Sequence, residues 1–223
     1  MKITARPSKI CTCLGLAFLL ASCGADDDSS TSSVALFGNS DGEWKIMDVG
    51  DTEYCIPQTL PDLSSQTPGT TKAGGMKLTV TIADSGTTYS TRLSFYAESS
   101  CTTLEYESLE KGTQVIGSAD IAPAVRTLDL TATSLTVTPK VAYAAGAWSY
   151  ICGRSVPLNQ ATDVLQATCS ANLKEQPFQV IKVEGDKQYR SVKPATSANT
   201  DGSTAEKRNT VVLELGYLTR QGS

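Results

Sequence analysis

The fold class follows from residues 76–95, which read MKLTVTIADSGTTYSTRLSF. Apolar side chains recur at every second position in both halves, which is the spacing of strands with one buried and one exposed face. Between the halves, Asp84-Ser85-Gly86 combines residue types that favour tight turns. The stretch therefore predicts a β-hairpin. Its expected inward-facing side chains are Met76, Leu78, Val80 and Ile82 on the first arm, and Tyr89, Thr91, Leu93 and Phe95 on the second.

Short alternating segments continue on both sides of this hairpin and predict a protein made mainly of β-strands. Their Thr-rich composition favours strands over helices. Turns are expected at Glu110-Lys111-Gly112 and at Glu184–Lys187, and long loops at 57–75 and 194–208. Further strands are expected at Trp44–Met47, Leu104–Tyr106, Val115, Leu128–Leu130, Leu135–Val137, Phe178–Val180, Tyr189–Val192 and Val211–Tyr217.

One segment departs from the two-residue period. Thr138 suits a helix N-cap, and Pro139 suits the first helical position. Apolar side chains then follow at helical spacing up to Trp148, and Gly153 lies where a helix ends. We expect one helix of about three turns across 139–151, packed on the sheet by Trp148.

The expected elements are about eight to ten short strands and one helix, linked mostly between neighbours. Closing the sheet into a barrel removes its unpaired edges. The sequence therefore predicts a mainly β fold, a small antiparallel barrel. A β-sandwich is the competing arrangement.

The N-terminus reads as a leader. Lys2, Arg6 and Lys9 precede an apolar run, Leu14–Leu20, that is too short to span a bilayer. Leu20-Ala21-Ser22-Cys23 resembles the lipobox of bacterial lipoproteins. The resemblance implies that residues 1–22 are removed as a signal peptide. It implies that Cys23 carries the lipid anchor, that 23–41 is a linker and that 42–223 is a β domain. Gly24, where that family has Asp for inner-membrane retention, implies the outer membrane.

The seven cysteines fit this organisation. Two precede the lipobox, and Cys23 would carry the lipid. The remaining four are an even number in an exported chain, which predicts two disulfides. Three pairings are possible, and we favour Cys55–Cys101 with Cys152–Cys169 because the second pair flanks a short loop. A metal site is disfavoured because the four have no C-x-x-C spacing.

Composition excludes several kinds of chemistry. The chain has no histidine, which excludes Ser-His-Asp and Cys-His catalysis and zinc sites built on imidazole. Its net charge of −4 would become −7 without residues 1–22, which disfavours nucleic acid as a partner. No cofactor is predicted. The remaining catalytic candidate is a carboxylate pair for glycoside hydrolysis. It would be drawn from four acidic residues that flank Tyr54 and Tyr106, namely Asp51, Glu53, Glu105 and Glu107.

Gly42-Glu43-Trp44, at the start of the first expected strand, resembles the G-x-W feature of lipocalins. In that family an arginine near the end of the chain packs over the tryptophan. The resemblance implies that role for Arg220, and a barrel that encloses its ligand.

These observations predict a membrane-anchored, non-enzymatic lipoprotein of the bacterial envelope. Its β domain is expected to bind a small apolar ligand or another envelope component. Inward-facing side chains, Leu78, Val80, Leu93 and Phe95, are the predicted ligand contacts. A structural or protein-interaction role is the alternative if these side chains fill the barrel. A carboxylate-based hydrolase is the alternative from another class.

Overall fold

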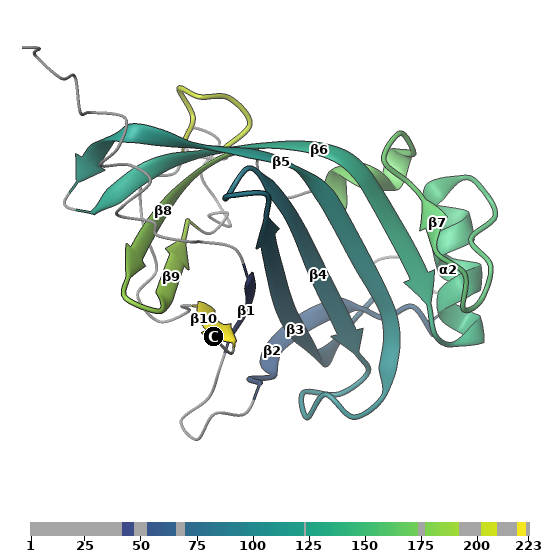
Figure 1. Ribbon diagram of the computed structural model, residues 1–223. Helices are drawn as coiled ribbons and strands as arrows, with labels where there is room; N and C mark the ends of the chain where they lie inside the picture. Colours follow the sequence, from purple (N-terminus) through teal and green to yellow (C-terminus); the bar gives the residue numbers. More distant parts are fainter. Residues whose placement is uncertain are drawn as a thin grey trace, which may run out of the picture.

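The computed structural model describes residues 42–46, 53–65, 70–122, 124–173, 177–191, 202–208 and 218–221. Ten strands and one α-helix lie in this part of the chain (Figure 1). The strands are β1 (Gly42–Ile46), β2 (Ile56–Pro61), β3 (Thr71–Ala83), β4 (Thr88–Tyr96), β5 (Leu104–Ala122), β6 (Val125–Pro139), β7 (Thr162–Asp163), β8 (Phe178–Glu184), β9 (Lys187–Arg190) and β10 (Leu218–Gln221). The helix is α2 (Ala142–Cys152), and a 3-10 helix, η1, covers Thr168–Asn172.

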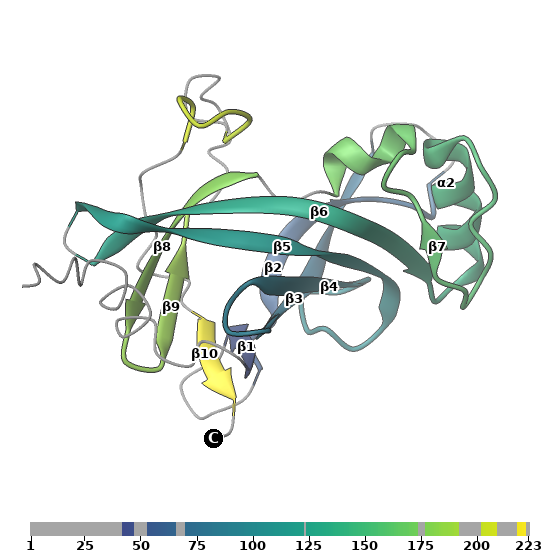
Figure 2. The same cartoon turned by 45° about the horizontal axis from the view of Figure 1, so that its top comes forward.

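Eight of the strands close into an antiparallel barrel. Hydrogen bonding runs in the order β1-β10-β9-β8-β6-β5-β4-β3, and pairing of β1 with β3 completes the ring. β2 pairs with β3 outside the ring, and β7 pairs with β6. The closed ring confirms the predicted barrel over the sandwich, and Figure 2 shows β5 and β6 as its long, curved strands.

The predicted hairpin is confirmed as β3 and β4. Leu78 pairs with Leu93, and Val80 pairs with Thr91, so the apolar positions of both arms share one face. Asp84, Ser85 and Gly86 all have positive φ, as expected where a chain reverses tightly. The alternation quoted above therefore sets both the register and the buried face.

The turn predicted at residues 110–112 is wrong. β5 runs unbroken through it, and β6 likewise joins the two segments expected at 128–130 and 135–137. The irregularity is a bulge between Lys111 and Gly112. A Cβ on Gly112 would lie 2.1 Å from the Thr131 carbonyl oxygen, so glycine here permits close approach of β6 rather than a reversal.

The loop predicted at 57–75 is also wrong, because it contains β2 and the start of β3. Prolines are compatible with a strand that has only one neighbour, and among the described strands β2 pairs with β3 alone. Gly75 of β3 lets the adjoining Cys55 segment come close, since a Cβ there would lie 2.5 Å from Cys55 Sγ. The glycines and prolines that suggested a loop instead shape a tightly packed strand pair.

The helix begins later than predicted. Pro139 is the last residue of β6 and pairs with Tyr106, so α2 starts at Ala142 with Val141 as its N-cap. The predicted end is confirmed, since Gly153 is the C-cap with φ 62°. Trp148 packs edge-on against Tyr106, with ring centroids 5.0 Å apart. The helix therefore covers one end of the barrel core, as Figure 2 shows.

Both predicted disulfides are confirmed. Cys55–Cys101 ties the chain before β2 to the connection between β4 and β5. Cys152–Cys169 ties the last residue of α2 to η1. The second bridge is part of the core cluster at the α2 end of the barrel, to which both of its cysteines belong.

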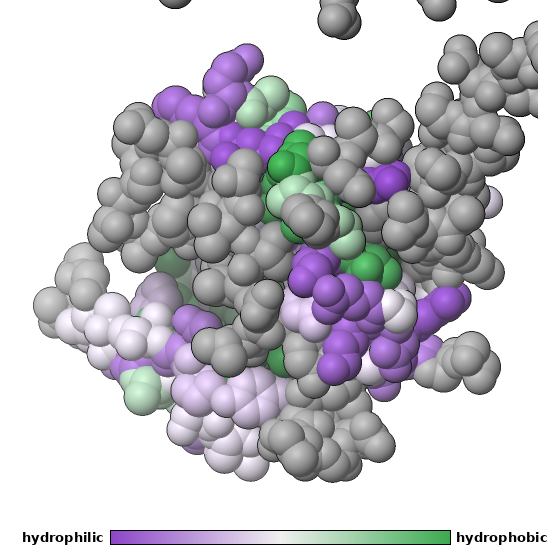
Figure 3. Space-filling model, turned by 90° about the vertical axis from the view of Figure 1, so that its left-hand side faces the viewer, coloured by the Kyte–Doolittle hydropathy of each residue, from purple (hydrophilic) through white to green (hydrophobic). Residues whose placement is uncertain are grey.

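Several predictions lie outside the described residues: the leader 1–22, Cys23, the linker 23–41 and the strand at 211–217. Among the helices of the described part, none is long and apolar enough to cross a membrane. Figure 3 views the molecule from the left-hand side of Figure 1, away from α2. Hydrophilic side chains form clusters on that face, with smaller hydrophobic areas between them.

Candidate functional site

The four predicted ligand contacts lie on the inner face of the hairpin and in the core. Leu78 and Val80 pack in a cluster with Trp44, and Val80 is completely buried. Leu93 and Phe95 belong to the cluster under α2, where Phe95 stacks on Tyr106 at 4.4 Å. None of the four lines either of the two cavities described below. Their neighbours are other core side chains.

The G-x-W segment has the predicted neighbour. Trp44 is buried, and the strand register places it directly opposite Arg220 of β10. Gly42 has φ 140°, and a Cβ there would lie 3.1 Å from Arg220 Nε. Glycine at this position therefore leaves room for the arginine side chain beside Trp44 at the start of the barrel.

The first cavity, which we call the bulge cavity, lies beside the bulge of β6 opposite Lys111 and Gly112, and it holds about 410 Å³. Tyr89 and Glu110 contribute its buried polar groups, and the Tyr89 hydroxyl donates a hydrogen bond of 2.5 Å to Glu110 Oε1. The remaining walls come from the middle of β6 and the start of β8. They are Leu130, Thr131, Ala132, Pro177 and Phe178.

Sequence reasoning missed Glu110 as an inner-face residue because it was assigned to a turn. A signal was present: the residues at 106, 108, 110, 112 and 114 continue one period of two, and all five are buried. The polar content of that series hid the pattern, since Ser108, Glu110 and Gln114 are among the buried polar side chains. Buried polar positions such as these require hydrogen-bond partners, which only the folded barrel supplies.

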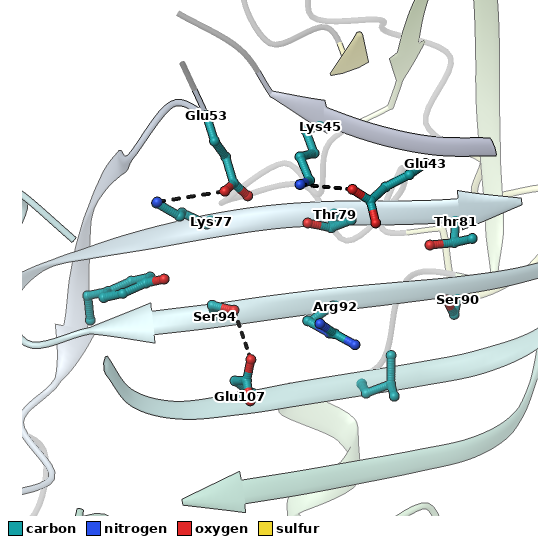
Figure 4. Close-up of a pocket in the computed structure, with 12 residues that line it drawn as sticks. Glu43, Lys45, Glu53, Lys77, Thr79, Thr81, Ser90, Arg92, Ser94 and Glu107 are labelled. Atoms are coloured by element: carbon teal, nitrogen blue, oxygen red, sulfur yellow. Dashed lines mark hydrogen bonds and ion pairs between the residues drawn. The ribbon is translucent and has the colours of Figure 1, made fainter. Parts of the chain in front are cut away.

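The second cavity, which we call the outer groove, lies on the opposite face of the hairpin and holds about 200 Å³ (Figure 4). Its side chains come from β1, β3, β4 and β5 and from Glu53. On β3 and β4 they alternate with the core residues, so Lys77 and Thr79 face the groove where Leu78 faces the core. The groove is therefore the polar side of the stretch that determines the fold.

Ion pairs neutralise the carboxylates of the outer groove. Lys45 Nζ lies 2.8 Å from Glu43, and Lys77 Nζ lies 3.7 Å from Glu53. The hydrogen bond to Glu43 raises the pKa of Lys45 above its ordinary value. Glu107 is paired with a lysine from outside the groove, Lys140, at 2.8 Å.

A third polar cluster lies under α2. Glu105 is 1% exposed, and Lys72 Nζ lies 2.5 Å from its Oε1. The Tyr143 hydroxyl of α2 donates a hydrogen bond to the same oxygen. Burial, together with that bond to Glu105, raises the pKa of Tyr143. Within the described residues, Glu105 Oε2 is buried and has no hydrogen-bond partner.

Of the four acidic residues considered for hydrolysis, the three that the structure describes do not form one site. Glu53 and Glu107 both line the outer groove, each with its own lysine, whereas Glu105 is buried against Lys72. Asp51 lies outside the described residues. Within the described ranges, no group of three or more acidic or cysteine side chains is placed to hold a metal ion.

No protein family matches this chain, and a comparison with curated proteins likewise finds no match.

Proposed function

We propose that this chain is a lipid-anchored lipoprotein of the bacterial envelope whose barrel binds a small, mainly apolar ligand in the bulge cavity. The Leu20–Cys23 segment supports the anchor through its resemblance to a lipobox. The two disulfides support export, because such bridges persist in oxidising compartments. The Gly42–Trp44 segment beside Arg220 agrees with the lipocalin resemblance.

The bulge cavity is the observation that carries the binding proposal. Its volume of about 410 Å³ lies in the range of small-molecule sites. Leu130, Ala132 and Phe178 supply apolar contact surface, while the hydrogen-bonded Tyr89 and Glu110 supply a polar corner. Glu110 already accepts a hydrogen bond from Tyr89, and a carboxylate can accept several, so a ligand that brings a hydrogen-bond donor fits beside it. The ligand class is therefore an apolar molecule with an amine or hydroxyl end.

The packing of the four residues that the sequence predicts as ligand contacts favours a second candidate function. Leu78, Val80, Leu93 and Phe95 lie among other core side chains, which is typical of a filled barrel that presents its outer surface to a protein partner. In this alternative, filling the bulge cavity leaves binding of the protein partner unchanged.

Binding can be tested with the full chain carrying Cys23→Ser, which needs no detergent if the anchor is absent. The probe is N-phenyl-1-naphthylamine, a fluorescent apolar molecule with one N–H donor. We expect saturable fluorescence enhancement that Ala132→Phe abolishes by filling the cavity. Val115→Phe is the matched control, because Val115 lies on β5 and is 66% exposed. Absence of saturable binding, or equal binding by both variants, would reject the proposal.

The anchor has a separate test. Cys23→Ser should move the protein from the membrane pellet to the supernatant when cells are fractionated, because no acyl chain would hold it. Acylation stabilises membrane binding by about 0.8 kcal/mol for each buried methylene, so almost none of the unsubstituted protein should be found in the supernatant. Unchanged membrane association of the variant would show that Cys23 is not the anchor.

A further inference from the structure

The strand register arranges the outer groove in rows that cross the sheet. Thr79 of β3 pairs with Arg92 of β4, which pairs with Leu109 of β5, and Lys45 of β1 pairs with Thr79. Arg92 therefore lies in the middle of the groove, with Thr79 beside it and Lys45 one strand further away (Figure 4).

Arg92 is the cation of this groove that the described residues leave without a carboxylate. The lysines at positions 45 and 77 each pair with a glutamate, and Glu107 is occupied by Lys140. Figure 4 draws no interaction from Arg92 to the side chains around it. A guanidinium offers a planar fork of N–H donors that matches a carboxylate or phosphate with two parallel bonds. The free fork therefore suits one anionic group.

Hydroxyl groups surround Arg92 on the same face. Ser90 and Ser94 lie two residues away on either side along β4, and Thr81 pairs with Ser90 from β3. A hydroxyl can donate one hydrogen bond and accept others, so such a set fits a ligand that is itself rich in hydroxyls. The Tyr96 ring lies at the end of the groove with Lys77 Nζ 5.7 Å from its centroid.

The rim restricts the charge of the ligand. Glu43, Glu53 and Glu107 line the groove, and each is paired with one lysine, so Arg92 supplies the one unmatched positive charge among the described groove residues. A ligand with one acidic group for each hydroxyl-rich unit meets the guanidinium without crowding these glutamates.

We propose that the outer groove is a binding site for an acidic saccharide, in which Arg92 takes the acidic group and Thr79, Thr81, Ser90 and Ser94 contact the sugar hydroxyls. The site lies on the opposite face of the sheet from the bulge cavity and is independent of it. The saccharide can be a free sugar acid or a unit of a polymer, since both present the same carboxylate and hydroxyls.

Calorimetric titration of the full chain carrying Cys23→Ser tests this proposal. The probes are D-galacturonate, tri-galacturonate, neutral D-galactose and inorganic phosphate. We expect a galacturonate probe to bind with at least about tenfold higher affinity than galactose or phosphate, because it alone meets both the guanidinium and the hydroxyls. Tighter binding of the trimer than of the monomer would support a polymer as the source, and equal binding a free sugar acid.

Variants then assign the binding to the groove. Arg92→Gln should weaken galacturonate binding about tenfold or more, and Arg154→Gln, at an exposed arginine beyond α2, should leave it unchanged. Ser94→Ala should weaken galacturonate and leave phosphate unaffected. Failure of both galacturonates to bind at about 10 mM, phosphate binding as tightly as galacturonate, or equal binding by Arg92→Gln would overturn the proposal.

Discussion

Lys72→Met should destabilise the barrel strongly because it removes the cation from a buried carboxylate. Glu105 is 1% exposed, and Lys72 Nζ lies 2.5 Å from its Oε1. The replacement has nearly the same length and keeps the apolar part of the side chain. Its effect therefore reports the lost charge rather than lost packing.

The expected loss in the free energy of unfolding follows from the burial of Lys72 and Glu105. Breaking a fully buried ion pair costs about 3 to 5 kcal/mol, because the remaining charge stays desolvated and unpaired. Lys72 is 22% exposed, and the Tyr143 hydroxyl still donates to Glu105 Oε1, so we expect the lower end, about 3 kcal/mol. Lys140→Met is the matched control, since its pair with Glu107 is 32% and 25% exposed and should contribute about 1 kcal/mol or less.

Urea unfolding at neutral pH with the disulfides intact, followed by tryptophan fluorescence, gives both free-energy changes. Trp148 lies in the core cluster under α2 and reports on this end of the barrel. Adding Glu105→Gln to Lys72→Met should recover part of the loss, because the buried charge is then removed. The reasoning is refuted if Lys72→Met costs no more than Lys140→Met, or if the added Glu105→Gln destabilises further.

Four more outcomes are expected. Replacing both Cys152 and Cys169 with Ala should lower the free energy of unfolding by about 3 kcal/mol, measured by urea denaturation, since the bridge closes a loop with a sequence separation of 17. Gly75→Ala should destabilise the protein by about 2 kcal/mol or more, because the new Cβ would lie 2.5 Å from Cys55 Sγ of the other disulfide. Gly146→Ala in α2 has open space around its Cβ and should stabilise the protein by about 0.5 to 1 kcal/mol in the same assay. Burial raises the pKa of Tyr106, so the folded state holds the hydroxyl proton more tightly than the unfolded chain does. The stability that this group contributes is complete below about pH 10 and falls above it. Tyr106→Phe should therefore lose less stability at alkaline pH, measured as denaturation midpoints from about pH 8 to 11.

The sequence predicted the parts of the fold that depend on local alternation. Residues 76–82 and 89–95 alternate, and the hairpin formed with the expected turn and inward face. Glycine and proline misled the prediction elsewhere. Gly112 allows β6 to approach β5, and Pro57 lies on a strand with one neighbour, yet both residues also occur in turns. Their meaning depends on a partner strand that is distant in sequence.

Side-chain pairing across the barrel was harder to predict than strand position. Nothing local indicates that Glu105 meets Lys72, since 33 residues separate them and Lys72 lies in a segment that the sequence predicts to be a loop. The Tyr89–Glu110 pair is similar, with the added difficulty that Glu110 was assigned to a turn. Such contacts require the register of three or more strands, and one misplaced turn is enough to lose them.

The outer groove shows how much one alternating stretch determines. A strand period of two means that the residues between inward-facing ones must face outward. Once Leu78, Val80 and Leu93 are assigned to the core, Thr79 and Arg92 must therefore share the other face, and the hairpin register pairs them. The polar composition of that face could be read from residues 76–95 alone. Its electrostatics could not, because the glutamates of the groove, and the lysine that pairs with Glu107, come from β1, from the chain just before β2, from β5 and from the chain just before α2. Charge neutralisation by distant segments, rather than the local pattern, is what makes this face a specific candidate for an anion.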